Sequence, residues 1–153
     1  MDIRLKKLLP ISCICSIYRN TTLNELIISL DTILNQKYIP NEIVIIVNGE
    51  IKSDVEKFTN FLKKEISIFK FITLRNNMGL GLALRSGLLH CTNEIVARFD
   101  SDDINLEDRL KKQYDLICSN KEISIIGSSV IEFNNFSSQN KYNLKKVPLN
   151  YLD

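Results

Sequence analysis

Hydrophobic and polar positions along the chain follow two alternating patterns. Short continuous apolar runs predict buried strands, whereas apolar residues three or four positions apart predict helices that turn one face toward a core. The strand-like runs cover residues 11–18, 42–47, 69–74 and 95–99. Helical spacing follows at 23–34, 53–62, 80–89 and 106–117. Two further short strands are predicted at 123–126 and 130–133.

Capping signals mark the starts of two helices. Thr22 and Glu25 have the spacing of a capping box, in which each side chain accepts a hydrogen bond from the backbone N–H of the other. Ser53 and Glu56 repeat this spacing ahead of the second helix. Pro40 prevents the first helix from continuing, because proline lacks the N–H that a helix interior requires.

The order of elements predicts an α/β fold. Strands separated by helices of about a dozen residues form a mostly parallel sheet with helices on both faces. Ligands of such sheets bind beyond the carboxyl ends of the strands. Three polar turns are expected to meet at that edge, at 18–21, 48–50 and 100–103.

Composition fits one soluble globular domain. The 153 residues are 44% hydrophobic and 25% charged, and a net charge of +2 gives no reason to expect a nucleic-acid partner. No apolar stretch approaches the roughly 18 residues of a membrane span, so we expect a cytoplasmic protein. The basic and apolar residues at 3–9 are either a frayed terminus or a peripheral contact with the inner face of the membrane. The four cysteines form no C-x-x-C pair, which argues against zinc.

Three aspartates stand within four positions directly after the fourth strand. In an extended segment residues two apart point the same way, so Asp100 and Asp102 can face a common point while Ser101 faces away and Asp103 starts the next helix. Carboxylates are ligands that Mg²⁺ or Mn²⁺ prefers, and such an ion takes its remaining ligands from water and substrate phosphates. A turn that only caps the next helix is the alternative reading.

Two glycines near the start of the third helix, Gly79 and Gly81, also have two readings. They ease a tight turn, or they let backbone N–H groups approach a phosphate at the helix start. Their spacing lacks the full G-x-G-x-x-G pattern, so the residues alone leave the choice open.

Four ordered segments carry a resemblance to a known family: "SIYRN", "ISLDTILNQKYIPNEIVIIVNG", "NNMGLGLALRSGLLHCTNEIVARFDSDDINLEDRLKKQ" and "ISIIGSSVIEF". Together they resemble the amino-terminal, nucleotide-sugar-binding part of family 2 glycosyltransferases, most of all those that build bacterial capsule, exopolysaccharide and lipopolysaccharide. The resemblance runs from about residue 11 to 133. It implies the GT-A, Rossmann-like fold and inverting, metal-dependent transfer from a nucleoside-diphosphate sugar, expected to be a UDP-sugar, to a saccharide or lipid-linked acceptor.

The resemblance also implies roles for individual residues. Asp100 and Asp102 match the family's D-x-D, which holds the divalent metal, Mn²⁺ or Mg²⁺, and the sugar nucleotide around it. Tyr18 and Arg19 match the loop after the first strand, which lies against the nucleoside, although another polar residue usually stands at Arg19.

Other matching positions depart from the family pattern. Asn48 stands where an aspartate commonly reads uracil, and Val47 stands where another acid often precedes it. An asparagine amide still has a donor and an acceptor for a base edge, but it lacks the charge of a carboxylate. Gly79 and Arg85 fall in the segment that packs near the nucleotide. Arg98 either balances the carboxylates when metal is absent or is a strand-edge surface residue.

The carboxyl end departs most from the family. The resemblance implies a general base in a later segment, and no candidate follows Phe133 before the chain stops at Asp153. We therefore expect residues 1–153 to form a single domain truncated at its carboxyl end, a donor half without the acceptor half and without an identified catalytic base. The alternative to an enzyme is a non-catalytic nucleotide-sugar-binding module. An uncovered sheet edge predicts a homodimer or a partner that supplies the acceptor half.

Overall fold

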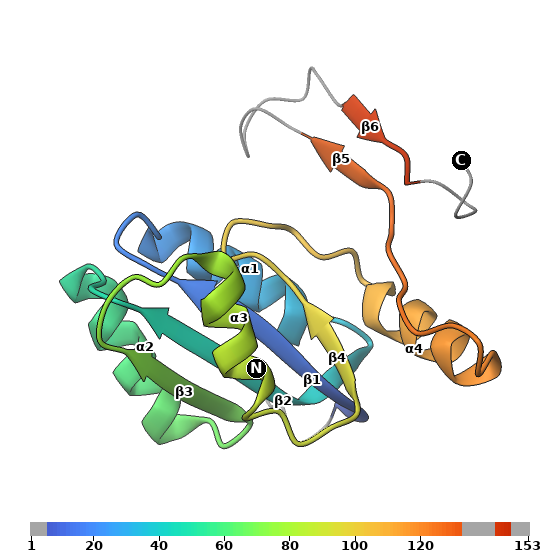
Figure 1. Cartoon of the computed structure of the whole chain (residues 1–153), viewed down its shortest axis with the longest axis horizontal. Coiled ribbons are helices and arrows are strands. Elements are labelled where there is room, and N and C mark those ends of the chain that lie inside the picture. The colour runs from blue at the N-terminus through green and yellow to red at the C-terminus, as the bar shows by residue number, and fades with distance from the viewer. Residues whose placement is uncertain (1–5, 133–142, 148–153) are drawn as a thin grey trace. The chain divides into compact units, whose positions relative to one another are not determined.

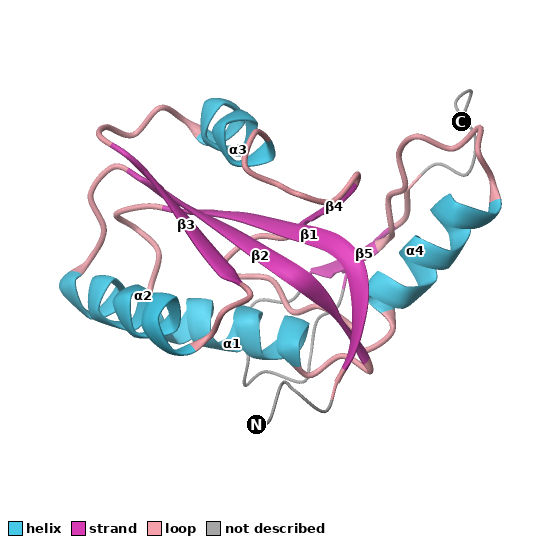
Figure 2. Ribbon diagram, turned by 90° about the horizontal axis from the view of Figure 1, so that it is seen from below, coloured by secondary structure: helices cyan, strands magenta, loops and turns pink. Residues whose placement is uncertain are grey.

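The structure is a computed structural model that describes residues 6–132 and 143–147. It divides into two compact units, Met1–Tyr114 and Asp115–Asp153. The first unit holds a four-stranded parallel sheet in the order β3-β2-β1-β4, with helices on both faces (Figures 1 and 2). The predicted α/β class with a mostly parallel sheet is confirmed.

The elements follow the predicted order. They are β1 (Lys7–Ile17), α1 (Leu23–Leu34), β2 (Tyr38–Asn48), α2 (Ser53–Glu65), β3 (Phe69–Leu74), α3 (Leu80–Leu88), β4 (Ile95–Arg98), α4 (Arg109–Ser119), β5 (Val130–Glu132) and β6 (Asn143–Lys145). The range predicted for β3 is confirmed at both ends. The first two strands begin earlier than predicted, and each contains a proline.

Pro10 and Pro40 lie inside strands and do not stop them. Pro10 falls in the register shift of the β1–β2 ladder between Leu9 and Ser12, where regular pairing is already interrupted. A missing N–H is tolerated at such irregular positions. Pro40 still lies beyond the end of α1 at Leu34, so the predicted end of that helix is confirmed.

Only one of the two predicted capping boxes forms. At the start of α1, the Glu25 N–H donates to Thr22 Oγ1 at 3.3 Å and the Thr22 N–H donates to Glu25 Oε2 at 3.4 Å. The second box, predicted from Ser53 and Glu56, is wrong. Ser53 is already the first residue of α2, and Lys52 occupies the N-cap position without a side-chain hydrogen bond.

The two faces of the sheet are covered differently (Figure 2). Ile43 and Ile45 of β2 pack with the α1 and α2 side of the core, and Val44 and Ile46 pack with the α3 side. All four are fully buried, as the continuous apolar run predicts for a strand covered on both faces.

Helix α3 approaches the sheet through small residues. Ala83 and Gly87 are buried, and a Cβ on Gly87 would lie 2.5 Å from Ile46 Cδ1. The outer positions of α3 are therefore uncovered: Leu80, Leu88 and Leu89 are 50%, 49% and 81% exposed. Their predicted place in the core is wrong, because close packing by alanine and glycine turns these leucines outward.

Two predictions for the carboxyl-terminal part need correction. Helix α4 begins at Arg109, so Leu106 precedes it and is 71% exposed. Residues 123–126 form no strand, and Ile125 is 90% exposed. In the second unit, β5 and β6 pair antiparallel. Phe133, predicted as the end of the β5 run, lies outside the described residues. Among the helices of the described chain, none has the length and apolar character needed to cross a membrane.

Candidate functional site

The carboxyl ends of the parallel strands bring the predicted polar turns to one edge of the sheet. Residue Ile17 at the end of β1 pairs with Val47 of β2, and Ile14 pairs with Arg98 at the end of β4. Neighbouring strands lie about 4.8 Å apart. The loops after β1, β2 and β4 therefore leave the sheet side by side, within about 10 Å across.

The acidic loop is fixed to the core by its backbone. The Ser29 hydroxyl of α1 donates to the Asp100 carbonyl at 2.8 Å, and the Phe99 N–H donates to the Ile14 carbonyl at 3.1 Å. Ser101 is only 9% exposed, whereas Asp102 is exposed and Asp100 is partly exposed. This burial pattern matches the alternation predicted for the segment.

Residues 104–108 lie between the acidic loop and α4, so the prediction that Asp103 starts the next helix is wrong. The reason is that α1 binds this segment. The Asn105 N–H donates to Thr32 Oγ1 at 3.0 Å, and Asn105 is 6% exposed. Sequence reasoning missed Ser29 and Thr32, although hydroxyl residues three positions apart share one face of a helix and were a visible signal.

Two arginines lie against the acidic loop. Arg98 Nη2 lies 2.5 Å from Asp100 Oδ1 and 2.6 Å from Oδ2. Arg109 Nη2 donates to the Arg98 carbonyl at 2.5 Å, and its other terminal nitrogen binds the Asn105 side chain. Burial lowers the pKa of Arg109.

Negative charge exceeds positive charge at this loop. Burial raises the pKa of Asp103, and the neighbouring carboxylates of Asp100 and Asp102 raise it further. Burial also raises the pKa of the Cys15 thiol, and the same carboxylates add to the effect. The ionised forms of carboxylates that repel one another in this way are stabilised by a bound cation.

The donor atoms of the loop are of the type that a hard divalent cation takes. Asp100 and Asp102 carry carboxylate oxygens, which are ligands that Mg²⁺ or Mn²⁺ prefers. Within residues 6–132 and 143–147, no group of three or more His, Cys, Asp or Glu side chains is arranged to hold a metal. Two protein carboxylates with the remaining ligands from a diphosphate and water is therefore the arrangement that this donor set supports.

The loop after β1 has a fixed backbone and exposed side chains. The Tyr18 N–H donates to Thr21 Oγ1 at 3.1 Å, and the Thr21 N–H donates to the Tyr18 carbonyl at 3.0 Å. Thr21 is buried, whereas Tyr18 is 39% exposed and Arg19 is exposed. Both predicted nucleoside contacts thus face solvent from a rigid turn.

Asn48 holds the loop between β3 and α3. It is 4% exposed, and its Oδ1 accepts the Met78 N–H at 2.9 Å. Its Nδ2 donates to Asn77 Oδ1 at 3.2 Å and to the Gly79 carbonyl at 3.4 Å. The amide expected to read a base edge is thus engaged by the protein, and only one lone pair of Oδ1 is left by these contacts.

The turn after β2 touches the same loop. Gly49 has φ +80°, and a Cβ there would lie 2.7 Å from the Asn77 nitrogen, so only glycine fits this close approach. Gly79, at φ +78°, is the N-cap of α3, and its N–H donates to Asn77 Oδ1 at 2.9 Å. Arg85 is exposed on α3. No contact described for Gly79 or Arg85 joins it to the acidic loop.

A cavity of about 380 Å³ opens beside this edge, between α2 and β3. It contains none of the seven residues predicted for the site. Its lining combines apolar, polar and charged residues: Val47, Gly49, Glu50, Ile51, Glu56, Thr59, Asn60, Lys63, Phe71 and Thr73.

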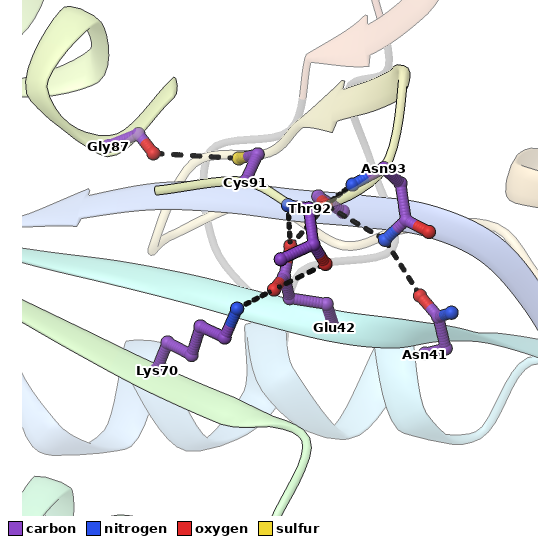
Figure 3. A network of polar contacts seen from close by, with 8 residues as sticks. Asn41, Glu42, Lys70, Gly87, Cys91, Thr92 and Asn93 are labelled. Atoms are coloured by element: carbon purple, nitrogen blue, oxygen red, sulfur yellow. Dashed lines mark hydrogen bonds and ion pairs between the residues drawn. The ribbon is translucent and has the colours of Figure 1, made fainter. Parts of the chain in front are cut away.

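A second polar cluster lies near the starts of β3 and β4, away from this edge (Figure 3). Glu42, 4% exposed, accepts from the Thr92 N–H and the Thr92 hydroxyl, each at 2.9 Å, and pairs with Ser12 and Lys70. Asn93 Nδ2 donates to Ser12 Oγ at 2.9 Å. Burial raises the pKa of Glu42, but the hydrogen bonds from Lys70, Ser12 and Thr92 outweigh it and bring the pKa to about 2.

Comparison with known proteins places the chain in a family. The model of "Glycosyl transferase family 2" matches residues 12–151. The chain is 37% identical over 120 residues to UDP-Gal:alpha-D-GlcNAc-diphosphoundecaprenol beta-1,3-galactosyltransferase of Escherichia coli, covering 78% of this chain and 43% of that protein. It is 33% identical over 146 residues to the amylovoran biosynthesis glycosyltransferase AmsE of Erwinia amylovora, covering 93% and 52%. The chain thus spans about half the length of these relatives.

Solved structures agree on the fold. The chain is similar to the mannosyltransferase PcManGT of Pyrobaculum calidifontis, solved with GDP-Man and Mn²⁺, with TM-score 0.59 and 19% identity over 76% of this chain and 34% of that one. It is similar to S. aureus TarS with TM-score 0.63 and 17% identity over 92% and 23%. The chain belongs to glycosyl transferase family 2 and has the GT-A fold.

Proposed function

We propose that this chain binds a nucleoside-diphosphate sugar together with Mn²⁺ or Mg²⁺ at the carboxyl edge of its sheet. It does so as the donor half of an inverting glycosyltransferase in bacterial surface-polysaccharide synthesis. The observation that carries the proposal is the acidic loop: Asp100 and Asp102 follow the edge strand β4, are partly exposed and exposed on an anchored backbone, and lie in excess negative charge.

Each residue has a task in this proposal. Asp100 and Asp102 hold the metal, which when bound neutralises the diphosphate and stabilises it as leaving group. Tyr18 and Arg19 contact the nucleoside from their fixed turn, and Arg85 approaches the nucleotide from α3. Asn48 orders the loop that ends at Gly79. We assign Asn48 this positioning task in preference to reading the base, because its amide is already bonded to that loop.

The transfer itself needs more than these residues. The acceptor hydroxyl attacks the anomeric carbon from the face opposite the diphosphate, a new C–O bond forms as the sugar–phosphate bond breaks, and the hydroxyl proton passes to a base. We assign that base to none of the described residues. The acceptor is proposed to be a saccharide or a lipid-linked saccharide, as in the name of the Escherichia coli relative. We further propose that the protein works in the cytoplasm, at the inner membrane face when the acceptor is lipid-linked.

Calorimetric titration of UDP tests the proposal. With Mn²⁺ present we expect binding, with loss of heat signal in EDTA and at least about tenfold weaker binding for Asp102→Asn, because that change removes the negative charge of one of the two proposed protein ligands. Asp108→Asn, which removes an exposed acid paired with Lys112 outside the loop, is the matched control and should bind as the original chain does.

Three outcomes of this titration are informative. Binding of GDP in place of UDP would support the proposed metal and diphosphate site and would change the proposed nucleobase from uracil to guanine. PcManGT, for example, was solved with GDP-Man. Metal-dependent binding with no sugar release in the presence of donor and acceptor would favour the second candidate, a nucleotide-sugar-binding module without turnover. That candidate agrees with the described residues, to none of which we assign the catalytic base. No binding of UDP, GDP or CMP to folded protein would contradict both.

A further inference from the structure

Arg98 occupies the position from which a cation reaches Asp100. It is the last residue of β4 and stands two positions before Asp100, so both side chains point to the same side of the extended segment. One guanidinium nitrogen, Nη2, lies 2.5 Å from Oδ1 and 2.6 Å from Oδ2 of the carboxylate. Both oxygens of a proposed metal ligand are therefore shared with a single positive nitrogen.

Contacts with neighbouring residues hold the backbone of Arg98, whereas its guanidinium group is partly exposed to solvent. Arg109 donates to the Arg98 carbonyl and is itself held by Asn105, so the backbone of Arg98 is anchored. The Arg98 side chain is 50% exposed and that of Asp100 is 39% exposed. A guanidinium half in water can leave a carboxylate without first being extracted from the core.

We propose that Arg98 is a built-in counter-cation that holds Asp100 and competes with the divalent metal for its two oxygens. This inference rests on the proposed function. Asp100, Asp102 and Asp103 place three carboxylates within four positions of one loop. In the metal-free protein Arg98 offsets the charge of Asp100 through its contacts with both carboxylate oxygens, and a metal that binds these oxygens must displace it. The arginine therefore lowers the affinity for metal and keeps Asp100 in position for it.

Titration of Mn²⁺ alone, followed by the electron paramagnetic resonance signal of free Mn²⁺, tests the inference. Arg98→Gln should bind Mn²⁺ about two- to fivefold tighter than the original chain, the range that a half-exposed ion pair supports. Lys57→Gln removes one positive charge from the exposed surface of α2 and should leave the affinity unchanged. Circular dichroism confirms that each variant is folded.

A double-mutant cycle separates direct competition from a general charge effect. In an Asp100→Asn background the carboxylate that Arg98 holds is gone, so Arg98→Gln should give a smaller gain than in the original chain. An equally large gain in that background would overturn the inference, as would equal or weaker Mn²⁺ binding by Arg98→Gln. Failure of both the original chain and Arg98→Gln to bind Mn²⁺, even when the titration is repeated with saturating UDP, would contradict the proposed function as well. Binding of Mn²⁺ by Arg98→Gln but not by the original chain would support the inference most strongly, because Arg98 would then exclude the metal.

Discussion

Two acidic clusters lie at opposite edges of the same sheet, and their surroundings differ. Glu42 is buried and receives hydrogen bonds from Ser12, Lys70 and Thr92, which bring its pKa to about 2 (Figure 3). In the loop of Asp100 to Asp103 the side chains of Asp102 and Asp103 are exposed, and partial burial together with the neighbouring carboxylates raises the pKa of Asp103. A carboxylate whose bonds are all supplied by the protein is a structural element. Carboxylates that repel one another at a surface have a use for an external cation.

The Glu42 cluster also explains how the edge strand is positioned. Residues Thr92 and Asn93 lead directly into β4, and Glu42 and Ser12 bind them from β2 and β1. The strand that carries the acidic loop at its far end is thus fixed at its start by the saturated carboxylate. The acidic loop is proposed to bind ligand, and the Glu42 cluster holds the strand on which that loop depends.

The largest predicted effect is on stability. Glu42→Gln removes the ion pair with Lys70 and turns an amide group toward donors that need an acceptor, so we expect a loss of about 3 kcal/mol in the free energy of unfolding. Urea denaturation at pH 7 measures it. Glu65→Gln, an exposed acid at the end of α2, is the control and should change stability by less than about 0.5 kcal/mol. A loss as small as that control would show that the cluster is not structural.

The pH dependence of stability should separate the two clusters. The folded pKa of Glu42 lies below its ordinary value of 4.5, so its contribution is complete above about pH 4.5 and is lost as the pH falls toward 2. The shift corresponds to about 3 kcal/mol. Unfolding of the original chain and Glu42→Gln between pH 7 and pH 3 measures the contribution as the difference between the two proteins. A difference that does not shrink at low pH would contradict the assignment.

Asn48 offers an intermediate effect. Asn48→Asp restores the acid that the family commonly has, but it replaces the donor Nδ2 with an oxygen that faces Asn77 Oδ1 and the Gly79 carbonyl. We expect a loss of about 1–2 kcal/mol in the free energy of unfolding and weaker UDP binding, because the loop between β3 and α3 loses the hydrogen bonds that Asn48 Nδ2 donates to it. Asn60→Asp on the exposed surface of α2 controls for added charge. Tighter UDP binding by Asn48→Asp at unchanged stability would restore the base-reading role.

The smallest effect has the opposite sign. A raised pKa in the folded protein means that ionised Asp103 is less stable there than in the unfolded chain, so stability falls as the pH rises through that pKa. Asp103→Asn should therefore stabilise the chain at pH 7, by less than about 1 kcal/mol because the group is exposed. Saturating Mn²⁺ with UDP should remove this advantage. Thermal melting with and without both ligands measures it, and a destabilised variant would contradict the repulsion.

The sequence was informative where local pattern decides structure. The fully buried run of β2, the cap of α1 at Thr22 and the place of Asp100 at the end of β4 follow from residues near one another in the chain. It was misleading where a distant element decides. The segment before α4 is held by Thr32 of α1, and the outward leucines of α3 follow from Gly87 packing on Ile46.

Long-range polar contacts were the least visible from sequence. Glu42 stands within a strand-like run, and its partner Thr92 lies 50 positions away. The amide of Asn48 is likewise taken by a loop about 30 positions later. No periodicity or spacing reports such pairs, because they depend on which strands become neighbours. The candidate site was thus predictable as a set of exposed loops, whereas the residues that hold those loops were not.

The most direct test of this comparison locates bound metal on the labelled protein by nuclear magnetic resonance. Mn²⁺ broadens the amide signals of nearby residues, so substoichiometric Mn²⁺ with UDP should broaden the signals of Tyr18, Arg19 and residues 101–103 first. The signals of Asn41, Thr92 and Asn93, around the saturated Glu42, should stay sharp. Broadening around Glu42 first, or none at the acidic loop, would contradict the assignment of one cluster to ligand and the other to structure.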